Sequence, residues 1–175
     1  TTDCSGYFSG VAAQLGHRME PGKDWTAPTT TAEMIKTLGH GNSCFKTVED
    51  NIWPSDVVFY NDGEKGHVYM INTVSSGGPG RCDFSIIESS GGSDAEFGGP
   101  RVVTKGGSAG GAAVSDNVGA SMAGMSKSCV AKDGKDVKVV RFDSKKPGCR
   151  GTPKQFKNEA CVKEKCDNLG RSSKA

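Results

Sequence analysis

Two residues in the sequence, Cys4 and His67, have the types and the local settings of a nucleophile and its base. Cys4 lies in the stretch DCSGYFSGVAAQLG, and His67 lies in WPSDVVFYNDGEKGHVYMI. A thiol attacks as the thiolate, and the unpaired N–H groups and the dipole of a helix N-terminus lower a thiol pKa. The sequence therefore predicts a cysteine hydrolase in which a thiol in the first turn of a helix faces an imidazole.

The residues that follow Cys4 predict the helix that carries it. Apolar side chains recur there at spacings of three and four, which indicates a buried helical face: Tyr7, Phe8, Val11, Ala12 and Leu15. Gly16 supplies a stop for this helix. We expect Asp3 to cap the helix or to hydrogen-bond backbone near the substrate, whereas Ser5 is small and leaves room for a substrate carbonyl.

His67 is expected on the second strand of a β-hairpin packed against the cysteine helix. The run 55–60 is rich in β-branched and aromatic residues and ends in the turn Asn61-Asp62-Gly63. The predicted strands span residues 56–60, 67–74, 83–88 and 101–104. A helix is predicted over 31–38, for which Thr29, Thr30 and Thr31 offer capping hydroxyls ahead of Glu33.

The chain divides into three sections by composition. Residues 1–105 form the predicted catalytic core, and residues 106–128 are a Gly-, Ala- and Ser-rich loop or linker. Residues 129–175 form a basic, cysteine-rich extension, either a separate module or part of the same domain. We expect a strand at 137–142 and a helical piece around 153–166 in that extension.

Seven cysteines divide into one nucleophile and six others: Cys44, Cys82, Cys129, Cys149, Cys161 and Cys166. Six cysteines can form three disulfides in any of 15 connectivities. A metal site at Cys161 and Cys166 is the competing interpretation, but the spacing CVKEKC is not that of a zinc knuckle and no His lies nearby. Disulfides, and with them an oxidising compartment, are favoured; no metal or other cofactor is expected.

Charge is distributed unevenly along the chain. Residues 1–125 contain 8 basic and 14 acidic residues, whereas residues 126–175 contain 14 basic and 6 acidic residues. A basic tail on an acidic body either meets an anionic partner or folds back on the body, and a solvated lysine-rich surface is the alternative. No run approaches the roughly 18–20 apolar residues of a membrane span, so none is expected. Nucleic acid is not expected as a partner.

The pattern of a DCSG-type helix, a DVVFY-type strand, a turn and GHV resembles the NlpC-type and CHAP-type peptidoglycan cysteine hydrolases over about residues 3–92. The stretch CSGYFSGVAAQLGHRMEPG looks most like the amidase effectors of type VI secretion. The resemblance implies an α+β, papain-like NlpC-type fold. In that fold the N-terminal helix carries the Cys and packs on an antiparallel sheet that carries the His, here followed by the cysteine-rich extension.

The resemblance makes Cys4 the nucleophile and His67 the general base, with a third polar residue on the next strand. Glu88 is the first choice for that third residue, because a carboxylate would orient the imidazole. Ser90 lies on the same strand face and is the alternative, whereas Asp83 lies at the other end of the strand. Ser90, Asp3 and Ser5 are also candidates for binding the substrate.

The activity that the resemblance implies is cleavage of peptidoglycan stem peptides, as an amidase or endopeptidase. The protein would be a secreted antibacterial toxin that acts in the periplasm of a target cell. Its implied partners are peptidoglycan, a cognate immunity protein that occludes the cleft, and a component of the secretion apparatus. The alternatives are a housekeeping or phage-type wall hydrolase, a catalytically inactive wall-binding module and, less favoured, a lipid acyltransferase.

Overall fold

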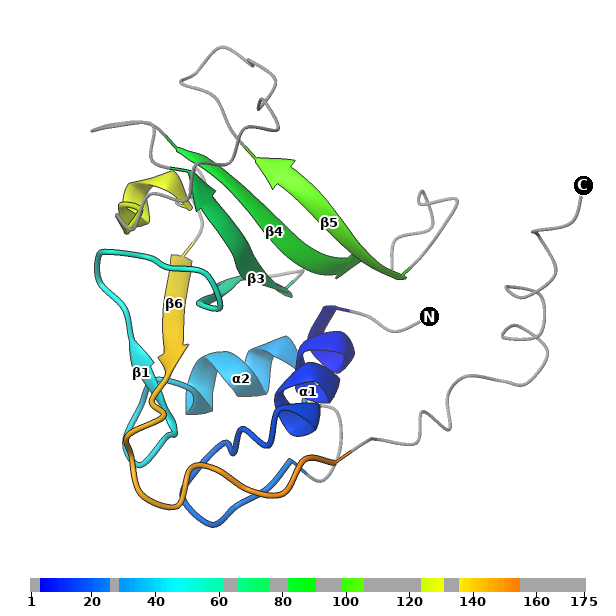
Figure 1. The fold of residues 1–175 in the computed structure, drawn as a ribbon, viewed down its shortest axis with the longest axis vertical. Coiled ribbons are helices and arrows are strands. Elements are labelled where there is room, and N and C mark those ends of the chain that lie inside the picture. Colours follow the sequence, from blue (N-terminus) through cyan, green and yellow to red (C-terminus); the bar gives the residue numbers. More distant parts are fainter. Residues whose placement is uncertain are drawn as a thin grey trace, which may run out of the picture.

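The computed structural model describes residues 4–25, 29–61, 66–75, 82–90, 99–105, 124–130 and 136–154 of the 175-residue chain. Two α-helices, six strands and a short 3-10 helix lie in these ranges (Figure 1). In chain order they are α1 (Cys4–Gln14), α2 (Thr31–Thr37), β1 (Phe45–Thr47), β2 (Val57–Asn61), β3 (Gly66–Ser75), β4 (Asp83–Ser90), β5 (Gly99–Lys105), η1 (Lys127–Cys129) and β6 (Asp136–Phe142). The predicted α+β class is confirmed.

All six strands form one antiparallel sheet in the order β1-β6-β2-β3-β4-β5. Strand β6 is an inner strand, with Val140 opposite both Thr47 of β1 and Val57 of β2. The part of residues 129–175 that forms β6 is therefore built into the main sheet. Such long-range insertion leaves no trace in the sequence pattern of either segment.

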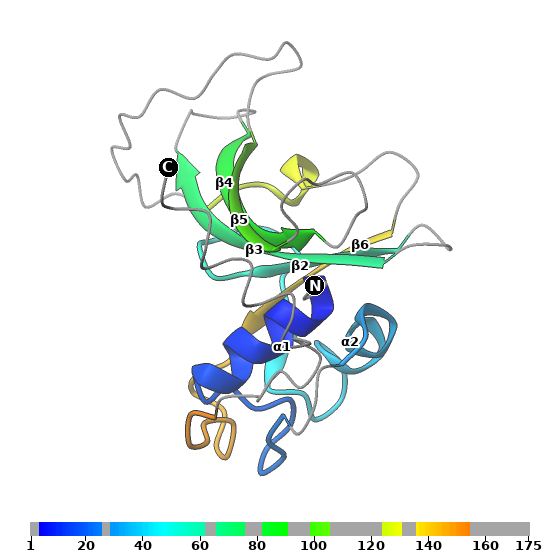
Figure 2. The same ribbon diagram turned by 90° about the vertical axis from the view of Figure 1, so that its right-hand side faces the viewer.

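The sheet separates two hydrophobic cores. Figure 2 shows α1 and α2 on one side of the sheet and η1 on the other. The core on the helix side contains Phe8, Met34 and Phe59, and the core on the far side contains Ile52 and Val139. Both faces of the inner strands are thus covered, as expected for strands with few polar residues.

The buried face of α1 differs from the predicted one. The buried residues of the helix are Ser5, Phe8, Ser9, Ala12 and Ala13, mostly small side chains that allow close packing. The helix ends at Gln14, and Gly16 has a φ of 67°, the left-handed conformation that glycine adopts at a helix end. Leu15 follows the last helical residue and is 58% exposed, so its predicted burial is wrong.

Two disulfides stabilise the described part of the chain, as predicted. Cys44 is bonded to Cys149, with a Cα–Cα distance of 5.4 Å, and Cys82 to Cys129, with 5.1 Å. The first joins the segment before β1 to the segment after β6. The other two cysteines of the predicted disulfide set lie outside the described residues, as do most of the predicted linker 106–128 and most of the predicted helical piece around 153–166. Of that piece, residues 153 and 154 are described and are not helical.

Neither helix of the described ranges combines the length and the apolar character that a bilayer crossing requires.

Candidate active site

Three residues that are far apart in the sequence meet at the N-terminus of α1. Cys4 is the first residue of α1, His67 the second of β3, and Glu88 lies near the end of β4. Nε2 of His67 lies 2.9 Å from Oε2 of Glu88, and the Cys4 thiol is hydrogen-bonded to the same imidazole. Since Glu88 occupies Nε2, Nδ1 is the ring nitrogen left for Cys4. The structure thus brings the predicted nucleophile, base and third residue into one hydrogen-bonded chain.

The antiparallel sheet fixes the imidazole. His67 is paired with Tyr60 of β2, and β4 lies on the other side of β3, with Ile87 opposite Met70. The ring centroid of His67 lies 5.4 Å from that of Tyr60 and 6.1 Å from that of Tyr69. Burial, together with the negative charges that Tyr60 and Glu88 can carry, raises the pKa of Tyr69 well above its ordinary value. The aromatic rings of Tyr60 and Tyr69 therefore flank the imidazole.

The pKa values of Cys4 and His67 shift in opposite directions. Burial alone would raise the pKa of Cys4, but hydrogen bonds from His67, from the backbone N–H of Val68 and from Thr31, with the positive charge of His67, lower it overall. Burial alone would lower the pKa of His67, but hydrogen bonds to Cys4 and Glu88 and their negative charges raise it overall. The two shifts together favour a thiolate beside an imidazolium, the reactive form of a Cys–His pair.

Glu88 is buried deeply enough to act as the partner of the imidazole. Its side chain is 9% exposed and that of His67 is 19% exposed. A charged hydrogen bond in such surroundings is stronger than one at the surface. Glu88 thereby fixes the orientation of the ring and stabilises its protonated form.

Thr31 is the residue of this site that the sequence analysis missed. The sequence treats it as one of three possible caps for α2, but Thr30 is the cap: its side chain accepts the Glu33 N–H at 3.3 Å and Glu33 Oε2 accepts the Thr30 N–H at 3.0 Å. Thr31 is 8% exposed, and its hydrogen bond is one of those that lower the pKa of the Cys4 thiol. The T-x-x-E capping pattern from Thr30 to Glu33 was the signal in the sequence that could have identified Thr31. It assigns the cap to Thr30 and leaves the hydroxyl of Thr31 available for another contact.

The other predicted site residues occupy different places. Ser5 is 7% exposed, inside the buried face of α1. Asp3 lies outside the described residues, and Ser90 is the last residue of β4, with its side chain outside them. Asp83 is opposite Ser75 at the far end of β4 from Glu88. Glu88 is therefore the candidate third residue whose contact with His67 is observed.

The described ranges hold no cluster of three or more His, Cys, Asp or Glu side chains suited to a metal ion.

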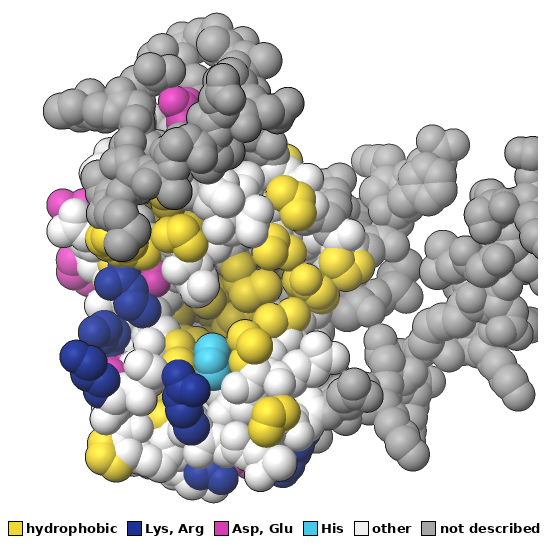
Figure 3. Space-filling view, in the orientation of Figure 1, with side chains coloured by type: hydrophobic (Ala, Val, Ile, Leu, Met, Phe, Trp, Pro, Cys, Tyr) yellow, Lys and Arg dark blue, Asp and Glu magenta, His cyan; other side chains and the backbone are white. Residues whose placement is uncertain are grey.

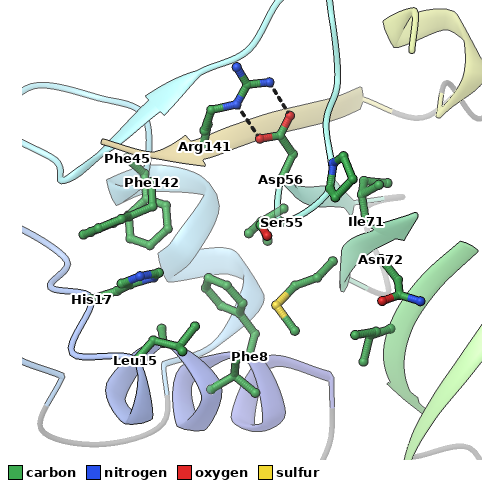
Figure 4. A pocket seen from close by; sticks show the side chains of 16 residues that line it. Phe8, Leu15, His17, Phe45, Ser55, Asp56, Ile71, Asn72, Arg141 and Phe142 are labelled. Atoms are coloured by element: carbon green, nitrogen blue, oxygen red, sulfur yellow. Dashed lines mark hydrogen bonds and ion pairs between the residues drawn. The ribbon is translucent and has the colours of Figure 1, made fainter. Parts of the chain in front are cut away.

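A separate apolar cavity of about 380 Å³ lies between the second half of α1 and the sheet. Figure 3 shows hydrophobic side chains gathered on this face, with Lys and Arg side chains beside them. Figure 4 shows Phe8 and Leu15 on one side of the cavity and the Asp56–Arg141 ion pair on the other. His17 stacks on Phe142 at the rim, with 3.7 Å between ring centroids. Neither the thiol nor its imidazole lines this cavity, so it is distinct from the cluster at Cys4.

Comparisons of the chain with protein-family models, with curated proteins and with solved structures give no match. The activity is therefore inferred from the chain's own residues and motifs.

Proposed function

We propose that the protein is a cysteine hydrolase that cleaves amide bonds, with Cys4 as nucleophile, His67 as general acid and base, and Glu88 as the residue that orients His67. The observation that carries this proposal is the hydrogen-bonded chain from the Cys4 thiol through the His67 imidazole to the Glu88 carboxylate. The opposite pKa shifts of Cys4 and His67 support it, because perturbed pKa values cluster at functional sites.

The reaction is acyl transfer from the substrate amide to water. The Cys4 thiolate attacks the carbonyl carbon, and the carbonyl oxygen becomes an oxyanion. We assign the Cys4 backbone N–H as one donor to that oxyanion, because the first N–H groups of a helix lack partners within it. His67 gives its proton to the departing amine, and the thioester remains on Cys4. His67 then takes a proton from water, which attacks the thioester and releases the carboxylic acid and the Cys4 thiolate, so that the thiolate and the imidazolium are restored.

The proposed substrate is the stem peptide of peptidoglycan, and this part rests on the resemblance of the DCSG and GHV motifs to the wall hydrolases. The two disulfides are compatible with a protein that acts outside the cytosol, in an oxidising compartment. We further propose that the protein is an antibacterial effector that acts in the periplasm of a target cell, blocked in its producer by an immunity protein. A housekeeping or phage-type wall hydrolase would share the chemistry and differ in its setting.

The deciding experiment is digestion of purified peptidoglycan, with the products read by mass spectrometry. The wild type, Cys4→Ala and His40→Ala are compared, since His40 is exposed and lies outside the site. The proposal expects the wild type and His40→Ala to release stem-peptide fragments whose masses identify the bond, and Cys4→Ala to release none. If the folded wild type releases no fragment, peptidoglycan is not the substrate.

The biological setting needs a second measurement. The effector proposal expects growth arrest when the wild type is exported to the periplasm of a Gram-negative host, and normal growth with Cys4→Ala. Normal growth with a wild type that cleaves peptidoglycan in vitro would favour a housekeeping enzyme.

A further inference from the structure

The start of α2 is tied to α1 close to Cys4. The Ser9 hydroxyl, which is fully buried, donates to the Ser5 carbonyl at 2.9 Å and accepts the Thr29 N–H at 3.1 Å. One hydroxyl thus joins the first turns of α1 to the segment that enters α2. Two residues further on, Thr31 begins α2.

The same end of α2 lies against the strand that carries His67. A Cβ atom added at Gly66 would lie 3.0 Å from both Cβ and Cγ2 of Thr31, closer than side chains ordinarily approach. Only a glycine at position 66 therefore lets Thr31 come this near to β3 without a shift. At the other end of α2, Lys138 Nζ donates to the Ile35 carbonyl at 2.9 Å and fixes the helix to β6.

Thr31 is thus held between α1 and β3, the two elements that carry the thiol and the imidazole. Because Thr30 caps the helix, the Thr31 hydroxyl has no capping role, and it reaches Cys4. A hydroxyl can donate its one proton to a thiolate, and Thr31 is buried, where such a bond is strong.

We propose that Thr31 is a further catalytic residue, whose hydroxyl donates to Cys4 Sγ and stabilises it as the thiolate, and that Gly66 is the glycine that allows Thr31 to reach it. The inference rests on the proposed function only in that Cys4 is the nucleophile. It holds whatever amide the enzyme cleaves.

The test is the pH dependence of Cys4 alkylation by iodoacetamide, in which the thiolate displaces iodide and no substrate is needed. Labelling at Cys4 is followed by peptide mass spectrometry, which separates it from other thiols. Thr31→Val keeps the shape and removes the hydroxyl, whereas Thr31→Ser keeps the hydroxyl. Losing one hydrogen bond to a charged group should raise the alkylation midpoint of Thr31→Val by about one pH unit. Below the midpoint, alkylation should be about tenfold slower. Thr31→Ser should behave like the wild type.

An unchanged midpoint in folded Thr31→Val would overturn the proposal, because the hydroxyl would then contribute nothing to the thiolate. An equal shift in Thr31→Ser would overturn it too, because that variant keeps the hydroxyl. If Thr31→Val does not fold, Gly66→Ala decides, since it retains the hydroxyl and displaces it. Gly66→Ala should raise the midpoint less than full removal would, and an unchanged midpoint in this folded variant contradicts the proposal.

The substrate proposal and the Thr31 proposal fail in different ways. A shifted alkylation profile in a protein that leaves peptidoglycan intact supports Thr31 and rejects the substrate. Peptidoglycan cleavage that needs Cys4, together with an alkylation profile that Thr31→Val leaves unchanged, supports the substrate and rejects the role of Thr31.

Discussion

The carboxylate of Glu88 lies 2.9 Å from Nε2 of His67, so the imidazole on β3 is held from the neighbouring strand β4. The Cys4 thiol hydrogen-bonds to the same ring from a helix. A ring fixed from two sides by negative groups keeps its proton more firmly, and its pKa is accordingly raised.

Glu88→Gln should reduce hydrolysis by about 100-fold or more, since an amide leaves the geometry nearly intact and removes the charge that stabilises the imidazolium. The same change lowers the pKa of His67, so the alkaline limb of the kcat/KM profile should move to lower pH. The profile is measured on soluble peptidoglycan fragments. Glu49→Gln is the matched control, because Glu49 is 77% exposed and pairs with Lys127 away from the site. An alkaline limb that stays in place in Glu88→Gln would remove Glu88 from the mechanism.

The contact between His67 and Glu88 should also affect how the free energy of unfolding depends on pH. The pKa of His67 is raised in the folded state, so the folded protein binds this proton more tightly than the unfolded chain. The resulting stability is fully present below the unfolded pKa of about 6.5 and is lost as pH rises through the folded pKa. The gap in unfolding free energy between the wild type and Glu88→Gln should therefore narrow as pH rises. Urea unfolding at several pH values measures it, and a gap that widens would show that Glu88 does not hold the proton.

The sequence predicts those features that depend on neighbouring residues. The alternating run before Asn61 and the GHV motif place β2 and β3 to within a residue or so. Glu88 follows from the resemblance to the wall hydrolases, which implies a polar third residue on the strand after His67, and its contact with His67 is observed. The three residues that meet at the site, Cys4, His67 and Glu88, are thus all named from the sequence.

The sequence does not reveal relationships that arise from distant segments meeting. β1 has only three residues, too few for a period to show, and it forms by pairing with the last strand of the sheet. The pairing of β1 with β6 also brings Cys44 to its disulfide partner, Cys149, which the sequence alone does not identify. Thr31 reaches Cys4 because α1, α2 and β3 converge there, and a hydroxyl beside a helix cap gives no pattern of its own.

Removal of the Cys44–Cys149 disulfide by alanine at both positions should cost more stability than removal of Cys82–Cys129. The two bonds close segments with sequence separations of 105 and 47 residues, and the longer closure restricts the unfolded chain more. The expected loss for the first bond is about 4–5 kcal/mol. Cys44 and Cys149 are also fully buried, so the alanines leave a cavity in the helix-side core.

Urea unfolding of the two double variants, both keeping Cys4, gives the comparison. A larger loss for Cys82→Ala/Cys129→Ala would show that unfolded-chain entropy does not decide the order. Cys4 alkylation in the folded variants checks that the site itself is retained.

Among the ion pairs of the described residues, that of Asp56 and Arg141 should be the most sensitive one outside the site. Asp56 is 1% exposed, and its two oxygens accept from Nε and a terminal nitrogen of Arg141 at 2.6 and 2.7 Å. The Trp53 N–H adds a third bond at 2.9 Å. Arg141→Met leaves a buried carboxylate without its partner, which should cost about 3–5 kcal/mol.

Adding Asp56→Asn to Arg141→Met removes the unpaired charge and should recover part of that loss, because the amide oxygen can still accept the Trp53 N–H. The exposed Lys127–Glu49 pair is the control, and Lys127→Met should cost less than about 1 kcal/mol. Unfolding free energies of the four proteins of the cycle give the coupling between residues 56 and 141. A coupling as small as that of a surface pair would mean that water reaches the carboxylate once the guanidinium is gone. If Asp56→Asn instead recovers part of the unfolding free energy, the loss in Arg141→Met comes from the unpaired, desolvated charge of Asp56.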